Sequence, residues 1–470
     1  MGAAIRLRQA GFTDFIILER NSDVGGTWYN NRYPGCQCDV QSNLYSFSFA
    51  LNPNWSRTYS NQPEILEYLK RVADDYQLRP NIQFGCDVDS ARWDSTSRRW
   101  LLETSDGPIS AQFLISAHGP LSEPIIPNID GLESFAGPVF HSARWQHDVD
   151  LTGKRVGVVG TGASAIQIVP AIQPKVSQLF VFQRTPAWIV PRGDKPIPQW
   201  QQAIFRNVPM VQRLQRWAQY WIRELLVPPL VYSAGLGKWI ERWARMHLRK
   251  QVKDSRLQNL LRPQYRIGCK RILISNDFYP ALQQPNTQLI PEGVQRVEPH
   301  AIITADGNRH ELDVIVLATG FRAANHPLAE RIIGRSGLTL AQEWDANAKS
   351  YLGITVPDFP NLFLIAGPNT GIGHTSLVFM IEAQLGHILN TMKWIRRKQY
   401  AAFEVDSTVC DRFTENVQKR SKTTTWGDGT CKSWYLDHAG RNTTVWPGFT
   451  WEYWWRCWWS GSNCYRQVEG

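Results

Sequence analysis

The clearest chemical spacing in the sequence belongs to six small residues that follow the apolar run 156–159. They are Gly160, Thr161, Gly162, Ala163, Ser164 and Ala165. In this GxGxxA pattern, Gly160 permits a tight turn, Gly162 lets a pyrophosphate approach the backbone, and Ala165 keeps the next helix close to the sheet. The N-terminus of that helix offers free N–H groups and a positive dipole end to phosphates. The pattern therefore predicts a dinucleotide site between a strand and a helix.

A second apolar run, 179–182, shows which dinucleotide this site prefers. The run ends in Gln183-Arg184-Thr185. An acidic residue at this place would bind the ribose hydroxyls of NAD, whereas Arg184 with Thr185 favours the 2′-phosphate of NADP. The alternative is an ordinary strand–helix turn with a surface arginine, and we favour NADP.

The first twenty residues have the form of the second half of another nucleotide-binding unit. Residues 3–9 follow a helical pattern that Gly11 ends, and 15–18 form an apolar strand that leads to Glu19. A carboxylate in this place holds the ribose hydroxyls of a dinucleotide. Such a unit begins with a strand and a glycine turn, so we expect coding sequence upstream of Met1. Two half-sites in one chain predict a flavin and a nicotinamide that exchange a hydride.

The composition limits the class of protein. The chain has 470 residues, of which 43% are hydrophobic, as is usual for a soluble protein of two or three domains. It has no apolar run of about 18 residues that could span a membrane. Its net charge is +10, but lysine and arginine are scattered, so we expect a solvated surface and an anionic cofactor rather than nucleic acid. Nothing in the sequence indicates an oligomeric state.

The eight cysteines do not have the spacing of a disulfide framework. Only Cys36 and Cys38 lie close together, and no second pair is placed to complete a metal site, so we expect none. This usage of cysteine fits a reducing compartment, and we expect a cytoplasmic protein.

The order of elements predicts an α/β fold with two Rossmann-like dinucleotide-binding domains. We assign residues 1–140 and 300–470 to an FAD-binding domain that lacks its first strand and glycine turn, and 141–299 to an NADP-binding domain. Between about 196 and 262, segments rich in tryptophan, glutamine and arginine predict a helical insertion. Strand-like alternation follows from 288, with a turn at Asp306-Gly307.

A motif just before the NADP strand carries a family resemblance. Residues 135–145 read FAGPVFHSARW, which is FxGxxxHxxxW. The sequence resembles the Baeyer–Villiger monooxygenases, a branch of the class B flavin-containing monooxygenases. Gln146 departs from the family, which has proline or aspartate there. By this resemblance, His141 and Trp145 belong to a hinge that couples NADPH binding to domain rotation, and they do not transfer protons.

The resemblance extends over nearly the whole chain and implies roles for further residues. GGTWYNNRYPGCQCD at 25–39 is similar to the segment that contacts FAD, IGCKRILISNDFYP at 267–280 to the segment with the active-site arginine, and ATGF at 318–321 to the strand end that closes the flavin fold. KSWY at 432–435 is similar to the segment with a tryptophan that contacts NADPH. The implied cofactor contacts are Thr27, Trp28, Gln37, Asp39, Tyr45, Val88 and Trp434, and the implied catalytic residues are Arg271 and Asp39.

The family's chemistry explains why an arginine is needed. The resemblance implies that NADPH reduces FAD, that a flavin peroxide then forms from O2, and that one oxygen atom is inserted next to the carbonyl of a ketone, giving an ester or a lactone. Arg271, a permanent cation, would stabilise the negative oxygens, and Asp39 would hold Arg271 by charge pairing. Three alternatives stay open: a flavin monooxygenase that oxidises nitrogen or sulfur, a non-catalytic remnant that binds only NADP, and a disulfide-type oxidoreductase.

The C-terminal segment departs from the family. Trp454, Trp455, Trp458 and Trp459 stand where the family usually has an arginine-rich stretch. Indoles favour the membrane–water interface, so these residues could form a membrane anchor. They could also be arginine codons changed to tryptophan by single bases, and we favour this second interpretation over membrane contact.

Overall fold

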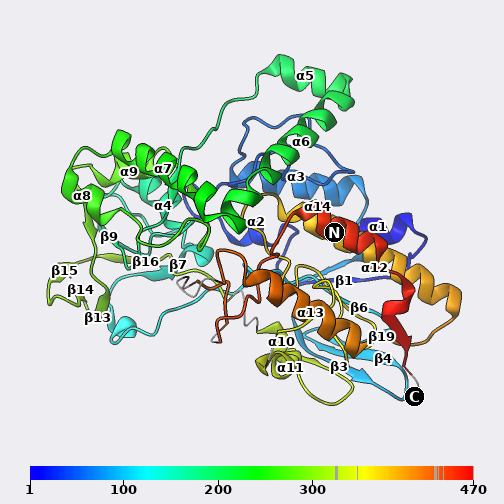
Figure 1. Cartoon of the computed structure of the whole chain (residues 1–470). Coiled ribbons are helices and arrows are strands. Elements are labelled where there is room, and N and C mark those ends of the chain that lie inside the picture. Colours follow the sequence, from blue (N-terminus) through cyan, green and yellow to red (C-terminus); the bar gives the residue numbers. More distant parts are fainter. Residues whose placement is uncertain (323–326, 347, 428–430, 432, 438, 469–470) are drawn as a thin grey trace.

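The computed structural model describes residues 1–322, 327–346, 348–427, 431, 433–437 and 439–468. Its architecture is α/β, with parallel sheets in the middle and helices around them (Figure 1). This confirms the predicted fold class. No described helix is long and apolar enough to cross a membrane.

A five-stranded parallel sheet carries the predicted NADP turn. Its strands, in spatial order, are β12 (Thr287–Ile290), β9 (Gln178–Phe182), β8 (Arg155–Val159), β16 (Val314–Leu317) and β7 (Val139–His141). The central strands are continuous apolar runs, as is typical of parallel strands that are buried on both faces. Helix α4 (Ala165–Ile172) follows the turn and buries its apolar side chains in the core of this sheet.

Strand β16 corrects one expectation. The strand that precedes 318–321 was assigned to the flavin part of the chain, but β16 pairs with β8 and β7 in the NADP sheet. The antiparallel strands before it are those predicted around Asp306-Gly307: β13 (Val294–Glu298), β14 (Ala301–Thr304) and β15 (Arg309–Glu311). We therefore propose that the boundary between the two parts lies after Leu317 and not near 300.

The N-terminal elements form the other nucleotide-type unit. Helix α1 (Gly2–Gln9) ends before Gly11, as predicted, and β1 (Ile17–Glu19) ends at the predicted carboxylate. Strand β1 pairs in parallel with β2 (Ile82–Phe84), and β6 (Leu114–Ser116) pairs in parallel with β18 (Leu362–Leu364). These are two separate parallel pairs in the described part of the chain.

Further elements enclose this unit. Helices α3 (Gln62–Asp75) and α12 (Leu377–Lys398) supply apolar side chains to the two clusters around α1. A four-stranded sheet has the order β17 (Ile332–Ile333), β3 (Val88–Asp94), β4 (Arg99–Thr104), β5 (Gly107–Ala111). The remaining short or peripheral elements are α2 (Thr27–Asn30), η1 (Arg79–Asn81), η2 (Leu132–Ser134), η3 (Ser142–Arg144), β10 (Ile189–Val190), β11 (Leu273–Ile274), α9 (Phe278–Leu282), α10 (Leu328–Arg331), α11 (Leu340–Ala346), β19 (Phe403–Val405), α13 (Ser407–Ser421), η5 (Ser462–Cys464) and β20 (Tyr465–Gln467).

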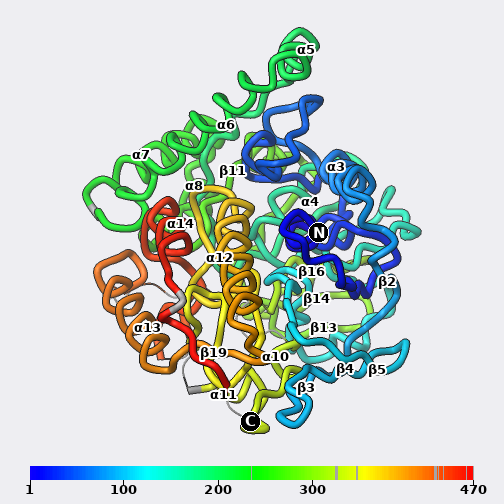
Figure 2. The backbone as a smooth tube through the Cα atoms, turned by 90° about the vertical axis from the view of Figure 1, so that its right-hand side faces the viewer, coloured from blue at the N-terminus to red at the C-terminus, as the bar shows by residue number. Residues whose placement is uncertain are grey.

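The stretch predicted as an insertion is helical. Its elements are α5 (Gln199–Asn207), α6 (Pro209–Glu224), the π-helical turn η4 (Pro228–Tyr232), α7 (Ala234–Gln251) and α8 (Ser255–Leu260). Helices α5 and α6 project from one end of the molecule in both views (Figures 1 and 2). The C-terminal helix α14 (Thr450–Trp459) lies along α12.

Candidate active site

Asp39 and Arg271 form an ion pair although 232 residues separate them. Arg271 donates from Nε to Oδ2 of Asp39 at 2.7 Å and from Nη2 to Oδ1 at 2.8 Å, which is the bidentate geometry of the strongest arginine–carboxylate pairs. The side chains are 34% and 26% exposed, so the pair borders solvent. The charge of Asp39 is the main cause that raises the pKa of Arg271, which is therefore a permanent cation.

A tight loop positions Asp39. Gly35 has a φ of +79°, and a Cβ there would lie 2.4 Å from the carbonyl oxygen of Gln167 in α4, so no larger residue fits. The side chain of Gln167 bonds both backbone groups of Gln37: its Oε1 accepts from the N–H at 3.2 Å, and its Nε2 donates to the C=O at 3.0 Å. The backbone of the predicted cofactor contact Gln37 thus fixes the flavin segment against the helix of the NADP turn.

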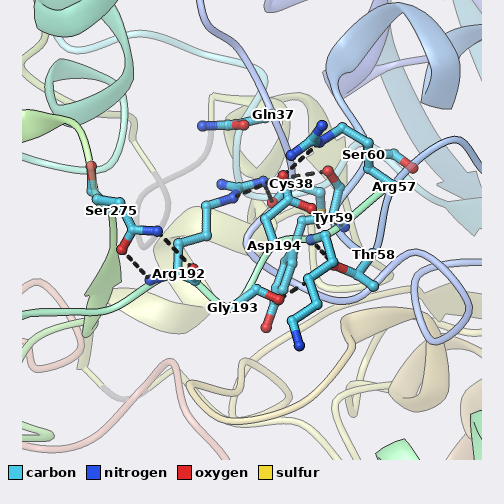
Figure 3. A network of polar contacts seen from close by, with 12 residues as sticks. Gln37, Cys38, Arg57, Thr58, Tyr59, Ser60, Arg192, Gly193, Asp194 and Ser275 are labelled. Atoms are coloured by element: carbon cyan, nitrogen blue, oxygen red, sulfur yellow. Dashed lines mark hydrogen bonds and ion pairs between the residues drawn. The ribbon is translucent and has the colours of Figure 1, made fainter. Parts of the chain in front are cut away.

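A second arginine supports the same loop. Arg192, which follows β10, is 5% exposed and donates from Nη2 to the carbonyl oxygens of Cys38 (3.2 Å) and Tyr59 (3.4 Å). Figure 3 shows its guanidinium directed at Cys38, the residue before Asp39. Burial lowers the pKa of Arg192, and Asp194 is its nearest carboxylate partner at 3.9 Å. Arg192 was not predicted from the sequence, because an isolated arginine gives no indication that it will be buried.

The flavin-contact residues lie in and around the short helix α2. Thr27 begins α2 directly after Gly25 and Gly26, which both have positive φ. Trp28 donates from Nε1 to the hydroxyl of Tyr45 at 3.0 Å, and the two rings meet edge to face. The structure therefore brings two of the predicted contacts together.

Glu19 and Val88 lie on neighbouring chain segments. Glu19 is half-buried at the end of β1, and its Oε1 accepts from the side chain and the backbone of Asn21. Its carbonyl oxygen accepts from the N–H of Cys86, two residues before Val88. Val88 itself begins β3 and joins the apolar cluster of the four-stranded sheet, while its carbonyl oxygen accepts from Arg331.

The turn between β8 and α4 is shaped as predicted. Gly160 has a φ of +114°, and a Cβ there would lie 2.5 Å from the carbonyl oxygen of Ala318. A Cβ at Gly162 would meet nothing within 4 Å, which leaves its backbone open to a ligand. Thr161 closes the turn by donating from Oγ1 to the carbonyl oxygen of Thr185 at 3.1 Å. The other residues of the turn are Ala163, which is exposed, Ser164, which is half-buried, and Ala165, which is fully buried.

Arg184 is exposed at the end of β9, and a lysine lies near it. Burial lowers the pKa of Lys270, and the positive charge of Arg184 lowers it further. Two cations thus approach the place expected for the 2′-phosphate. Lys270 was not predicted from the sequence, although its position next to Arg271 is a signal that could have indicated it.

Trp434 is half-exposed, and its ring centroid lies 4.5 Å from that of Tyr435. Tyr435 is buried beside Arg271: burial raises the pKa of the phenol, and the charge of Arg271 opposes that rise. A disulfide between Cys269 and Cys431 joins the segment of Arg271 to that of Trp434. The sequence could not show this bond, because its cysteines are 162 residues apart. Lys432 of the KSWY motif lies outside the described residues.

A cleft opens beside the ion pair. The residues that line it include Leu230, Lys270, Arg271, His374, Trp426 and Tyr435. This hollow places the Arg271 guanidinium next to apolar and aromatic surface.

Comparison with known proteins identifies the family. Residues 1–196 match the family described as pyridine nucleotide-disulphide oxidoreductase. A Baeyer–Villiger monooxygenase of Streptomyces coelicolor is 47% identical over 96% of this chain and 88% of the relative, and one of Pseudomonas aeruginosa is 44% identical over 96% and 86%. The crystal structure of OTEMO in complex with FAD and NADP has a TM-score of 0.89 and 30% identity, and the match covers 99% of this chain and 97% of that one.

This chain belongs to the Baeyer–Villiger monooxygenase family.

The motif on which the family resemblance rested lies at the edge of the NADP sheet. His141 ends β7 and is 2% exposed; its Nδ1 accepts from the N–H of Ala143, and its ring packs edge to face on Phe321. Burial lowers the pKa of His141 to about 4, so the ring is neutral at neutral pH. Trp145 packs edge to face on Phe140 of the same strand. The motif thus joins β7 to the segment at 318–321.

The cysteines near Asp39 do not have the properties of a redox pair, despite the name of the matched family model. Cys36 and Cys38 are buried and reduced. Burial raises the pKa of Cys36 to about 12 and that of Cys38 still further, so neither is a reactive thiolate. Among the described residues, no three His, Cys, Asp or Glu side chains gather as metal ligands.

Proposed function

We propose that this protein is an FAD- and NADPH-dependent monooxygenase that inserts one oxygen atom of O2 next to the carbonyl of an organic ketone, giving an ester or a lactone. The observation that carries the proposal is the bidentate pair of Arg271 with Asp39, the last residue of the predicted flavin segment. A cation fixed in this place can stabilise negative charge on oxygen, and oxidation of a carbonyl carbon needs such stabilisation.

The described residues offer contacts to both cofactors. For NADPH, the backbone at Gly162 is open, α4 presents its N-terminus, and Arg184 and Lys270 supply positive charge for the 2′-phosphate. For FAD, Glu19 would hold ribose hydroxyls, and Thr27, Trp28, Gln37, Tyr45 and Val88 would line the flavin side. FAD, when bound, supplies the activation of O2 after reduction by NADPH.

Four residues around the reacting centre would have separate roles. Arg271 stabilises negative oxygen without giving up a proton, because a guanidinium stays protonated in proteins. Asp39 holds Arg271 in orientation, and Arg192 holds the backbone of the Asp39 loop. Trp434 would contact NADPH from the segment that Cys431 joins to Cys269.

His141 would act as a part of a hinge and not as an acid or base. Its low pKa and its burial keep the ring neutral and away from solvent. Its edge contact with Phe321 couples β7 to the segment after β16, where the chain passes from the NADP sheet to the rest of the flavin part. A rotation between these parts would have to repack this contact.

The test is a substrate comparison with FAD-loaded protein. NADPH and O2 are supplied with either a cyclic ketone or a thioether, and the products are analysed by mass spectrometry. We expect lactone from the ketone, and we expect Arg271→Ala to lose lactone formation while NADPH binding persists. Sulfoxide from the thioether with no lactone from any ketone would favour a heteroatom-oxidising enzyme. Binding of NADP with no product from either substrate would favour the non-catalytic remnant.

A further inference from the structure

The faces of helix α6 are inverted relative to a normal amphipathic helix. Its inward face carries polar side chains at every fourth position: Gln212, Arg216, Tyr220 and Glu224. Arg216 donates from Nη1 to three backbone carbonyl oxygens, and Glu224 accepts from the backbone and the hydroxyl of Thr450. The interior of the protein therefore holds α6 largely through polar contacts, together with the ring of Tyr220, which stacks on Phe379.

The outward face of α6 is apolar. Its large side chains are between 41% and 73% exposed, and they follow helical spacing: Met210, Leu214, Trp217, Trp221 and Leu225. Trp200 and Ile204 of α5, and Val208 between α5 and α6, are also exposed. We call these eight residues the α5–α6 face. Soluble proteins rarely expose so many large apolar side chains side by side unless a partner covers them.

Exposed basic residues lie on the helices of this face and on α7, the next long helix. Residues 199–253 contain ten lysines and arginines and two glutamates, so most of the chain's net charge of +10 arises in this segment. Arg206 and Arg213 are exposed on α5 and α6, and Lys238 and Arg242 are exposed on α7. Figures 1 and 2 show that α5 and α6 project beyond the rest of the molecule, so a flat surface could reach them.

We propose that the α5–α6 face binds the surface of a lipid bilayer that contains anionic phospholipids. Tryptophan favours the membrane–water interface, and a helix with one strongly apolar face and basic neighbours lies in that interface. Each arginine or lysine near an anionic membrane adds to the attraction. The protein would lie on the bilayer and not cross it, since no described helix is long and apolar enough to span one.

The charge argues for a bilayer rather than a second copy of this chain. A two-fold symmetric dimer places the same surface of both subunits against each other. The basic residues around the α5–α6 face would then oppose like charges, which costs free energy. An anionic bilayer turns the same charges into attraction.

Co-sedimentation with vesicles tests the proposal. The FAD-loaded protein is mixed with phosphatidylcholine vesicles that either contain or lack phosphatidylglycerol, at low and at high salt. We expect binding to the vesicles with phosphatidylglycerol that weakens at high salt. Replacing three exposed apolar residues in L214Q/W217Q/W221Q should weaken partitioning roughly tenfold or more. Reversing two charges in R206E/R213E should also weaken it, and the effect should be largest at low salt.

A matched variant distinguishes vesicle binding through this face from nonspecific binding by exposed apolar side chains elsewhere. Leu101 and Leu338 are exposed to a similar degree but lie on β4 and before α11, away from α5 and α6, so L101Q/L338Q should bind vesicles like the unchanged protein. All variants change exposed side chains, and a thermal melt of each checks that it is folded. No vesicle binding, or equal binding by the L214Q/W217Q/W221Q variant, would overturn the proposal. A dimer in solution that this variant dissociates, without vesicle binding, would show that a second copy covers the face.

Discussion

Replacing Asp39 by alanine should slow ketone oxidation only through its effect on Arg271. The pair has two charge-assisted hydrogen bonds, but both side chains are partly exposed, so we take about 2 kcal/mol for the orientation they provide. If this orientation is used in the transition state, kcat falls roughly 30-fold. Arg271→Ala removes the cation itself and should lower kcat by about 10²–10³-fold.

A double-mutant cycle with these two substitutions tests the dependence. In the variant without Asp39 and Arg271, kcat should equal that of Arg271→Ala, because Asp39 has nothing left to position. Arg155→Ala is the matched control: it removes an arginine–carboxylate pair to Asp313 of similar length, 2.8 Å, at the end of β8 that is remote from the NADP turn, and should leave kcat unchanged. The assay is ketone-dependent NADPH oxidation combined with measurement of the product. Effects of the two substitutions that simply add, or full activity of Asp39→Ala, would refute the reasoning.

The other predictions concern the NADP turn and the buried histidines. Gly162→Ala should leave stability unchanged, because its Cβ meets nothing, yet should weaken NADPH binding roughly tenfold. Gly160→Ala introduces a clash at a positive φ and should lower the free energy of unfolding by at least about 1 kcal/mol. Urea unfolding and NADPH titration of both variants distinguish the two effects. Arg184→Ala should weaken binding of NADPH roughly tenfold and leave that of NADH nearly unchanged, as measured by titration; an equal loss for both would contradict the 2′-phosphate assignment. Burial lowers the pKa of His141, and of His387 in α12, to about 4, below the value near 6.5 in the unfolded chain. The free energy of unfolding should therefore fall as pH drops from about 6.5 towards 4, by up to roughly 1.4 kcal/mol per pH unit for each histidine. Equal free energies of unfolding near pH 7 and pH 5 would contradict this.

The sequence predicted elements where local pattern and packing agree. The strand, turn and helix around Gly160 carry their own apolar pattern and turn chemistry, and α1 and β1 likewise have clear apolar patterns and a glycine stop. The antiparallel strands around Asp306-Gly307 alternate as expected. The pairing of β16 with β8 was not predictable, because a fully apolar run gives no information about which neighbours it pairs with.

The candidate site was predictable only in part. The pairing of Asp39 and Arg271 came from the family resemblance, since nothing local relates two residues so far apart. Arg192 was not predicted, because its burial depends on three loops that come together only in the folded protein. The sequence of α6 could not predict that its polar face points inward, because an amphipathic helix normally places its apolar face inside.

The central claim is that this chain carries a flavin reduced by NADPH and reoxidised by O2. The most direct test is the visible absorption spectrum of the purified chain after FAD is added and free FAD is removed by gel filtration. We expect bound flavin absorbance that bleaches with NADPH and returns in air. A colourless protein that still binds NADP would contradict it.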